Sequence, residues 1–156
     1  MTQNIYDTPE FFEGYSQMAR SVHGLDGAPE WPAVRALVPD VKGRDVVDLG
    51  CGFGWFCRWA DEQGAANVLG LDVSENMLAR ARDTTRSTTI RYQRADLDQL
   101  QLPPQSVDLA YSSLTLHYLE HLPALFATVH QALKPGGRFV FLSLIHISEP
   151  TRLGMI

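Results

Sequence analysis

The chain has 156 residues, of which 45% are hydrophobic and 20% charged, and a formal net charge of -5. A chain of this length can bury a core without disulfides or metal ions, and two cysteines cannot build a secreted disulfide framework. The first ten residues lack a leader pattern, and no apolar run approaches the roughly 20 residues of a membrane span. The acidic balance argues against a phosphate backbone as the main partner. We therefore expect a cytoplasmic protein, and small molecules stay open as its partners.

Residues 1–43 predict a helical cap. Thr8 is suited to the N-cap of a helix that carries Pro9 in its first turn. A second short helix is expected from about Ala28, where apolar residues recur at helical spacing. Gly24 and Gly27 predict a loop between these two helices.

From residue 44 onward, predicted strands alternate with predicted helices. The strands are short apolar runs that end in a turn or a polar residue, and they cover 45–49, 67–71, 90–95, 107–111 and 138–141. Helices are expected after residue 54, from Ser74, and at about 120–133. This alternation predicts an α/β fold with a doubly wound parallel sheet between two helical layers. In such open sheets, ligands bind beyond the carboxyl ends of the strands.

A glycine-rich turn follows the first predicted strand and opens a helix. Asp48, Gly50, Gly52 and Gly54 form the pattern D-x-G-x-G-x-G. Glycines let the backbone turn sharply and let a ligand approach without a Cβ in the way. A dinucleotide-binding turn reads G-x-G-x-x-G, and here Trp55 occupies the position of its third glycine. The spacing favours another nucleoside cofactor, with a nicotinamide-dependent oxidoreductase and purely structural glycines as the alternatives.

Two further carboxylates stand where the second and third predicted strands end. A carboxylate at the position of Asp72 can accept hydrogen bonds from both hydroxyls of a ribose. Asp96 adds an acceptor where the amino group of an adenine would lie. Three acidic side chains, with no lysine or arginine in the glycine loop, fit a ligand that has an adenosine end and a positive centre. They fit a pyrophosphate poorly.

Five segments of the chain together resemble the class I S-adenosylmethionine-dependent methyltransferases, in particular the small-molecule group that includes the ubiquinone and menaquinone methyltransferases. The segments are VVDLGCGFG (46–54), LGLDVSENML (69–78), ADL (95–97), VDLAYSSL (107–114) and LKPGGR (133–138). The resemblance implies a Rossmann-like methyltransferase domain over 44–141, incomplete at its end, with strand order 3-2-1-4-5. It also implies S-adenosylmethionine as the cofactor and a small-molecule methyl acceptor.

The same resemblance implies a set of cofactor-binding residues. They are Asp48, Gly50, Cys51, Gly52, Gly54, Asp72, Met77, Asp96, Leu97, Ser112 and Ser113. The glycine loop would cradle the amino-acid part of the cofactor, and Asp72 would hold the ribose. Met77, Asp96 and the backbone of Leu97 would bind the adenine, and the two serines would lie by the methionine part. Simple packing remains the alternative for Met77 and for the two cysteines.

The catalytic residues cannot be assigned from the sequence, and no metal site is predicted. His117 follows the fourth predicted strand and is a candidate general base, with an ordinary loop histidine as the alternative. Methyl transfer from a sulfonium often needs only in-line positioning and a dry site. Tyr15 and Arg20 are candidates for a lid over the cofactor, and Asp108 is interpreted as structural. Residues 112–115 lack the motif of DNA amino-methyltransferases, which favours a small metabolite as acceptor.

Residues 142–156 depart from the family pattern. The string from Leu142 to Arg152 matches, codon by codon, the conceptual translation of a transposase adaptor used to prepare sequencing libraries. We interpret it as an artefactual tail that replaces the closing strands, with a natural strand end as the alternative. The fifth strand would then be an apolar, unpaired sheet edge, which is an aggregation hazard. We expect the chain to be insoluble or to bind the cofactor weakly without turnover; a non-catalytic cofactor-binding fragment is the alternative to an enzyme.

Overall fold

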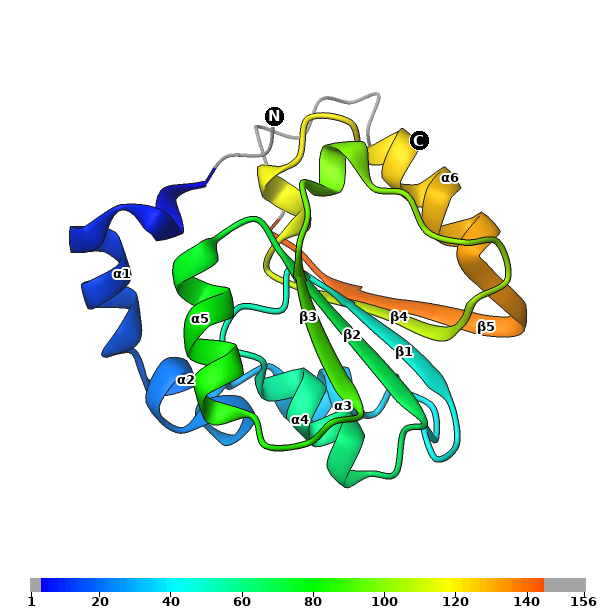
Figure 1. Ribbon diagram of the computed structural model, residues 1–156, viewed down its shortest axis with the longest axis horizontal. Helices are drawn as coiled ribbons and strands as arrows, with labels where there is room; N and C mark the ends of the chain where they lie inside the picture. The colour runs from blue at the N-terminus through cyan, green and yellow to red at the C-terminus, as the bar shows by residue number, and fades with distance from the viewer. Residues whose placement is uncertain (1–3, 145–156) are drawn as a thin grey trace, which may run out of the picture.

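A single parallel sheet forms the centre of the computed structural model, which describes residues 4–144 (Figure 1). Its strands are β1 (Asp45–Leu49), β2 (Asn67–Asp72), β3 (Ile90–Arg94), β4 (Val107–Ser113) and β5 (Leu133–Leu142). Their order is β3-β2-β1-β4-β5, and every neighbouring pair is parallel. The predicted fold class and strand order are confirmed.

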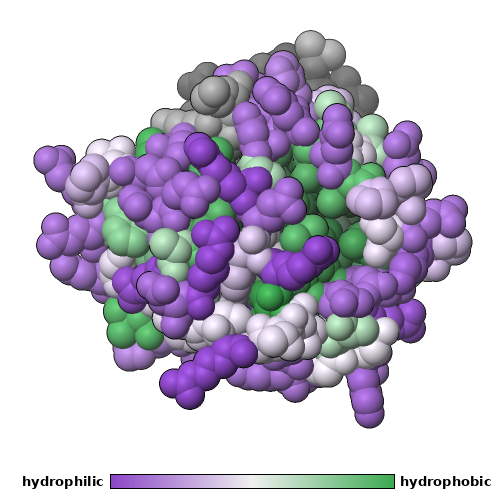
Figure 2. Space-filling model, viewed as in Figure 1, coloured by the Kyte–Doolittle hydropathy of each residue, from purple (hydrophilic) through white to green (hydrophobic). Residues whose placement is uncertain are grey.

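Helices cover both faces of this sheet (Figure 1). One face carries α3 (Trp31–Arg35), α4 (Trp55–Glu62) and α5 (Glu75–Thr84), and the other carries α6 (Leu122–Ala132). Successive strand residues point to opposite faces, so Val46 belongs to the apolar cluster under α4 and Val47 to the cluster under α6. In Figure 2 hydrophilic residues dominate the outer surface, and many of the hydrophobic ones are seen in a central recess. Within residues 4–144, no helix is long and apolar enough to cross a membrane.

The amino-terminal segment is more finely divided than the sequence predicts. It consists of η1 (Ile5–Asp7), α1 (Pro9–Ser16), α2 (Ala19–Val22) and η2 (Gly24–Gly27). Thr8 occupies the expected N-cap position of α1, with Pro9 in the first turn, but its side chain makes no capping hydrogen bond. The predicted loop at 24–27 forms the 3-10 helix η2. The helices η1 and α2 were not predicted. Helices of three or four residues form only with tertiary support, so no local pattern announces them.

The start of β5 differs from the prediction. We expected a turn over 134–137 followed by a strand at Arg138, but the strand begins at Leu133. Val107 pairs with Leu133 and Leu109 pairs with Arg138, so the residues between them form a bulge inside the strand. Of the predicted tail, only residues 142–144 belong to the described part of the chain, and the remainder lies outside it. Within the described part, β5 pairs with β4 alone.

Candidate functional site

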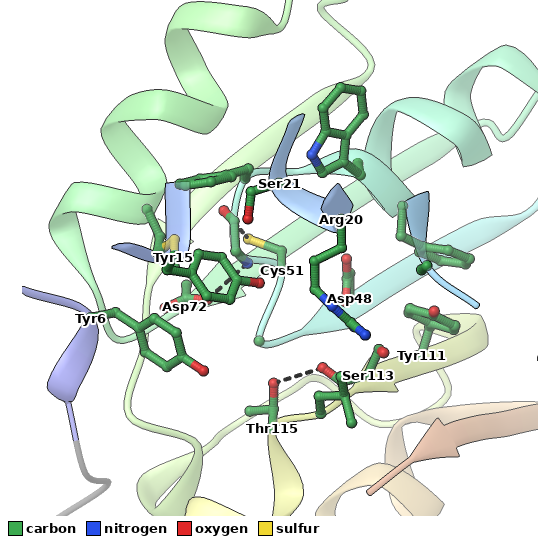
Figure 3. Close-up of a pocket in the computed structure, with 18 of the residues that line it drawn as sticks. Tyr6, Tyr15, Arg20, Ser21, Asp48, Cys51, Asp72, Tyr111, Ser113 and Thr115 are labelled. Carbon is green, nitrogen blue, oxygen red and sulfur yellow. Dashed lines mark hydrogen bonds between the residues drawn. The ribbon is translucent and has the colours of Figure 1, made fainter. Parts of the chain in front are cut away.

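A cavity of about 400 Å³ lies at the carboxyl ends of the central strands (Figure 3). Most of its lining comes from the ends of β1, β2 and β4, the turns that follow them, and the amino-terminal segment. The predicted site residues in the lining are Asp48, Gly50, Cys51, Gly52, Asp72, Met77, Leu97, Ser113 and His117. The lid candidates Tyr15 and Arg20 line it as well. The fold thus brings most of the predicted site together at the edge where parallel sheets bind ligands.

Three predicted cofactor residues do not line the cavity. Ser112 is fully buried, and its hydroxyl donates to the carbonyl of Leu49 at 2.7 Å. Side chains alternate along a strand, so Ser113 faces the cavity while Ser112 faces the α6 side. Asp96 is the N-cap of η3 (Leu97–Gln99), and its carboxylate accepts from the amide of Asp98 at 3.0 Å.

Gly54 is the third of these residues, and its position has a conformational reason. It is the N-cap of α4 with φ of 80°, in the left-handed region. A Cβ at this position would collide with the hydroxyl of Tyr92. Gly54 therefore shapes the loop and lets α4 pack near β3.

Asp48 is a buried carboxyl at the end of β1, with 2% of its surface exposed. The thiol of Cys57 donates to its Oδ2 at 3.6 Å. Burial, together with the nearby charge of Asp72, raises the pKa of Asp48 to about 8. The group is consequently mostly protonated at neutral pH. A positive charge placed in the cavity would favour its ionised form.

Asp72 connects the glycine loop to the turn after β2. Its Oδ2 accepts from the amide of Gly52 at 2.8 Å, and its Oδ1 accepts from the amide of Ser74 at 2.9 Å. Burial raises the pKa of this carboxyl, although the backbone amides of Ser74, Gly52 and Val73 oppose the rise. Each carboxylate oxygen has a second lone pair, so Asp72 can also accept from a bound ligand.

Aromatic residues form much of the wall contributed by the amino-terminal segment. The ring of Tyr6 contacts Phe11, Tyr15 and Tyr118 edge to face, with centroids 5.1, 5.3 and 6.0 Å apart. The hydroxyls of Tyr6 and Tyr118 lie 3.2 Å apart. Sequence reasoning singled out Tyr15 but missed Tyr6 and Phe11, because nothing local links these aromatics to the strand ends.

Arg20 and Glu30 form an ion pair in the same wall. The Arg20 guanidinium donates to both carboxylate oxygens of Glu30, at 2.7 and 3.3 Å. Among the described lining residues, Arg20 is the one arginine or lysine. In Figure 3 its side chain extends toward Asp48 and Ser113.

Tyr111 is a lining residue that the sequence analysis also missed. Its ring stacks on Phe56, with centroids 3.5 Å apart and planes 8° from parallel. The signal was present: Tyr111 lies two residues before Ser113, and residues at this spacing share a face of a strand. The stack joins β4 to the first turn of α4.

His117 lies in η4 (Leu116–Tyr118), directly after β4, and lines the cavity. Its Nδ1 is 3.4 Å from the hydroxyl of Ser143, and burial lowers the pKa of the imidazole. The geometry is compatible with both interpretations of His117, a general base and an ordinary loop histidine.

Asp108 has a structural role, as predicted. It lies at the opposite end of β4, where its carboxylate accepts from the amide of Asp45 at 2.8 Å and from Lys134 at 3.1 Å.

Comparisons with known proteins agree with this geometry. The family model described as "Methyltransferase domain" matches residues 47–141. A malonyl-[acyl-carrier protein] O-methyltransferase of Pectobacterium atrosepticum is 37% identical over 109 residues, which are 70% of this chain and 42% of the relative. The chain spans about half the length of the curated relatives it matches.

Two solved structures share the fold. An S-adenosylmethionine-dependent methyltransferase from Mesorhizobium loti is 69% identical with a TM-score of 0.74, over 76% of this chain and 55% of the other. A phosphoethanolamine N-methyltransferase of Haemonchus contortus, solved with phosphoethanolamine and S-adenosylhomocysteine, is 24% identical with a TM-score of 0.72, over 85% of this chain and 30% of the other. At that identity it supports the fold alone. The family model covers more than half of the chain, and the chain therefore belongs to the class I S-adenosylmethionine-dependent methyltransferases, with S-adenosylmethionine as the cofactor.

Proposed function

We propose that this domain binds S-adenosylmethionine in the cavity and that, once extended at its carboxyl end to the relatives' length, it transfers the methyl group to a small-molecule acceptor; the chain with its present tail binds the cofactor without turnover. The observation that carries the proposal is the pair of carboxyl groups on the adjacent strands β1 and β2, the buried Asp48 and the half-buried Asp72. Both line one cavity with the glycine loop. A ligand with a ribose and a positively charged centre suits such a pair, because the ribose hydroxyls can donate to Asp72 and the positive charge favours the ionised form of Asp48. A pyrophosphate would instead place negative charge beside Asp72.

The lining suggests a role for each part of the wall. Asp72 would accept from the ribose hydroxyls, and Met77 and Leu97 would pack on the adenine. Gly50 and Gly52 would leave room for the amino-acid part of the cofactor. The Arg20 guanidinium, which reaches the same space, would face the carboxylate of that part (Figure 3).

The chemistry requires little of the protein beyond placement. When bound, the cofactor supplies a methyl group activated by its positively charged sulfur. The aromatic wall around Tyr6 and Tyr15 excludes water, and the end of β4 with His117 borders the space left for an acceptor. His117 is a candidate for accepting a proton from the acceptor, since burial lowers its pKa and keeps the imidazole neutral.

We further propose a division into a helical cap over 1–43, a methyltransferase domain over 44–141, and an unrelated tail over 142–156. We also propose a cytoplasmic location and a small-molecule acceptor. The net charge of -5 argues against a nucleic acid as the acceptor. The relatives methylate acceptors as different as malonyl-[acyl-carrier protein] and trans-aconitate, by their names. The fold alone therefore does not determine the acceptor, and we propose that the residues lining the cavity do.

Two measurements test the proposed function. Calorimetric titration with S-adenosylhomocysteine should show saturable binding, and NADH should show none; the reverse preference would overturn the proposal. Incubation with methyl-labelled S-adenosylmethionine and a cell extract, followed by separation of metabolites from nucleic acids, identifies the acceptor class. Label in the nucleic-acid fraction alone would contradict a small-molecule acceptor. Cofactor binding without label in any fraction, also after carboxyl-terminal extension to the relatives' length, would favour the non-catalytic alternative.

A further inference from the structure

The carboxylate of Asp7 joins the amino-terminal segment to the start of α5. Its Oδ1 accepts from the hydroxyl of Ser74 and from the amide of Asn76, the latter at 3.1 Å. Its Oδ2 accepts from Asn4 at 2.8 Å and from the amide of Glu75 at 3.4 Å. The first amides of a helix have no partners within the helix, and its amino-terminal end attracts negative charge. Asp7 thus supplies α5 with an acceptor from a segment nearly 70 positions away in the sequence.

The neighbouring residue, Tyr6, lies over the cavity. Its ring is packed among Phe11, Tyr15 and Tyr118, and all four residues line the cavity. Figure 3 shows the rings of Tyr6 and Tyr15 beside Asp72. Among residues 4–144, η1 and its N-cap Asn4 have three kinds of polar contact with the rest of the domain: Asp7 with the start of α5, Asn4 with the carbonyl of Val73, and the Tyr6 hydroxyl with that of Tyr118. Because Tyr6 and Asp7 are adjacent in one short helix, fixing the carboxylate also fixes the ring.

We propose that Asp7 is a positioning residue that latches this segment to α5, holding Tyr6 over the bound cofactor and slowing its release. The inference rests on the proposed function, because it assigns the cavity to S-adenosylmethionine. The latch acts at a distance from the cofactor: Asp7 does not line the cavity, and its partners are the first residues of α5. Hydrogen bonds from Ser74 and Asn4 keep the pKa of Asp7 below its ordinary value although burial acts in the opposite direction, so the latch is charged at neutral pH.

A graded pair of substitutions in the full chain tests the latch. Asp7→Ala removes every acceptor and should raise the dissociation constant of S-adenosylhomocysteine about fivefold, the effect expected for loss of a helix cap. Asp7→Asn keeps one side-chain oxygen and should fall between the wild type and Asp7→Ala. Glu10→Ala is the control, because this exposed carboxylate in the first turn of α1 should leave binding unchanged. Equal affinities of the wild type and Asp7→Ala would overturn the proposal.

A double-mutant cycle separates the latch from a general effect on α5. If Asp7 acts through Tyr6, then Asp7→Ala should have almost no further effect on affinity once Tyr6→Ala is present. A merely structural role in capping α5 would instead give additive losses. Additivity would therefore contradict the proposal.

Hydrogen exchange on the ligand-free chain keeps this test independent of the proposed function. Asp7→Ala should speed the exchange of amides in 4–16 and leave those of β1 unchanged. If Asp7→Ala speeds exchange in 4–16 but the wild type does not bind S-adenosylhomocysteine, the contact of Asp7 with α5 does hold the segment, and the proposed cofactor is wrong. Unchanged exchange in 4–16 would refute the latch itself.

Discussion

The thiol of Cys57 in α4 donates to the buried carboxyl of Asp48 at the end of β1, with Sγ 3.6 Å from Oδ2. Burial raises the pKa of Asp48 from 3.8 to about 8. Between these two values the folded protein holds a proton that the unfolded chain has lost. The free energy of unfolding therefore falls as the pH rises from about 4 to about 8.

Asp48→Asn should remove this part of the pH dependence, because the amide has nearly the same shape and no charge. Urea unfolding at intervals between pH 5 and pH 8 measures the slope. Asp40→Asn is the matched control, since this carboxylate is exposed and should leave the slope as in the wild type. An Asp48→Asn protein as pH-dependent as the wild type would contradict the assignment.

Cofactor charge should be coupled to the protonation of Asp48. The positive sulfur of S-adenosylmethionine favours the ionised carboxyl, so binding at pH 7 should release a fraction of a proton into the buffer. S-adenosylhomocysteine has a neutral sulfur and should release less. Calorimetry in two buffers of different ionisation enthalpy gives both values, and Asp48→Asn should abolish the difference. Equal release by the two ligands in the wild type would argue against a sulfonium near Asp48.

Two features of position 50 require glycine: the left-handed backbone conformation and the lack of room for a side chain. Its φ is 82°, and a Cβ would collide with the side chain of Thr115. Gly50→Ala should cost about 1 kcal/mol for the left-handed backbone and a further 1–3 kcal/mol, roughly, for overpacking. Gly43→Ala has a similar φ of 69° with open space around the new Cβ, so it should cost only the first part. Equal losses in urea unfolding would show that the collision is relieved.

Asp72→Asn should weaken cofactor binding at least about tenfold, since it removes hydrogen bonds to a charged acceptor. The same substitution faces an NH₂ group toward either Gly52 or Ser74, both of which donate. Asp108→Asn is the matched control: it also neutralises a carboxylate that accepts a backbone hydrogen bond, but at the far end of the sheet. It should lower stability and leave the dissociation constant of S-adenosylhomocysteine unchanged. A similar weakening by both variants would mean that Asp72 acts through stability alone.

The fold was predictable from the sequence where a local pattern determines it. The apolar run of β1, the N-cap at Ser74 and the apolar stripe of α6 each carry their own signal, and the structure has these elements. The bulge in β5 has no such local signal, because a lysine followed by proline and two glycines is equally typical of an ordinary turn. Its position depends on pairing with β4 and on the contacts of Lys134 with Asp45 and Asp108.

The site was predictable where it coincides with a strand end. Asp48 and Asp72 follow from that rule, and both line the cavity. The Arg20–Glu30 pair and the ring of Tyr6 come from residues before β1. Part of this region contacts the rest of the domain through side chains far away in the sequence, such as Asp7 on the start of α5. Such contacts have no periodicity to read, which is why the wall opposite the strands was the least predictable part.

The alternation along β4 makes the two faces of this strand separately adjustable. Tyr111 and Ser113 line the cavity, whereas Ala110 and Ser112 are buried on the side of α6. Substitutions of Ser113 should change ligand preference at little cost in melting temperature. Those of Tyr111, which is buried and stacked on Phe56, and those at positions 110 and 112 should lower the melting temperature. A library that varies position 113 and keeps Tyr111 would therefore explore new acceptors on a scaffold that still folds.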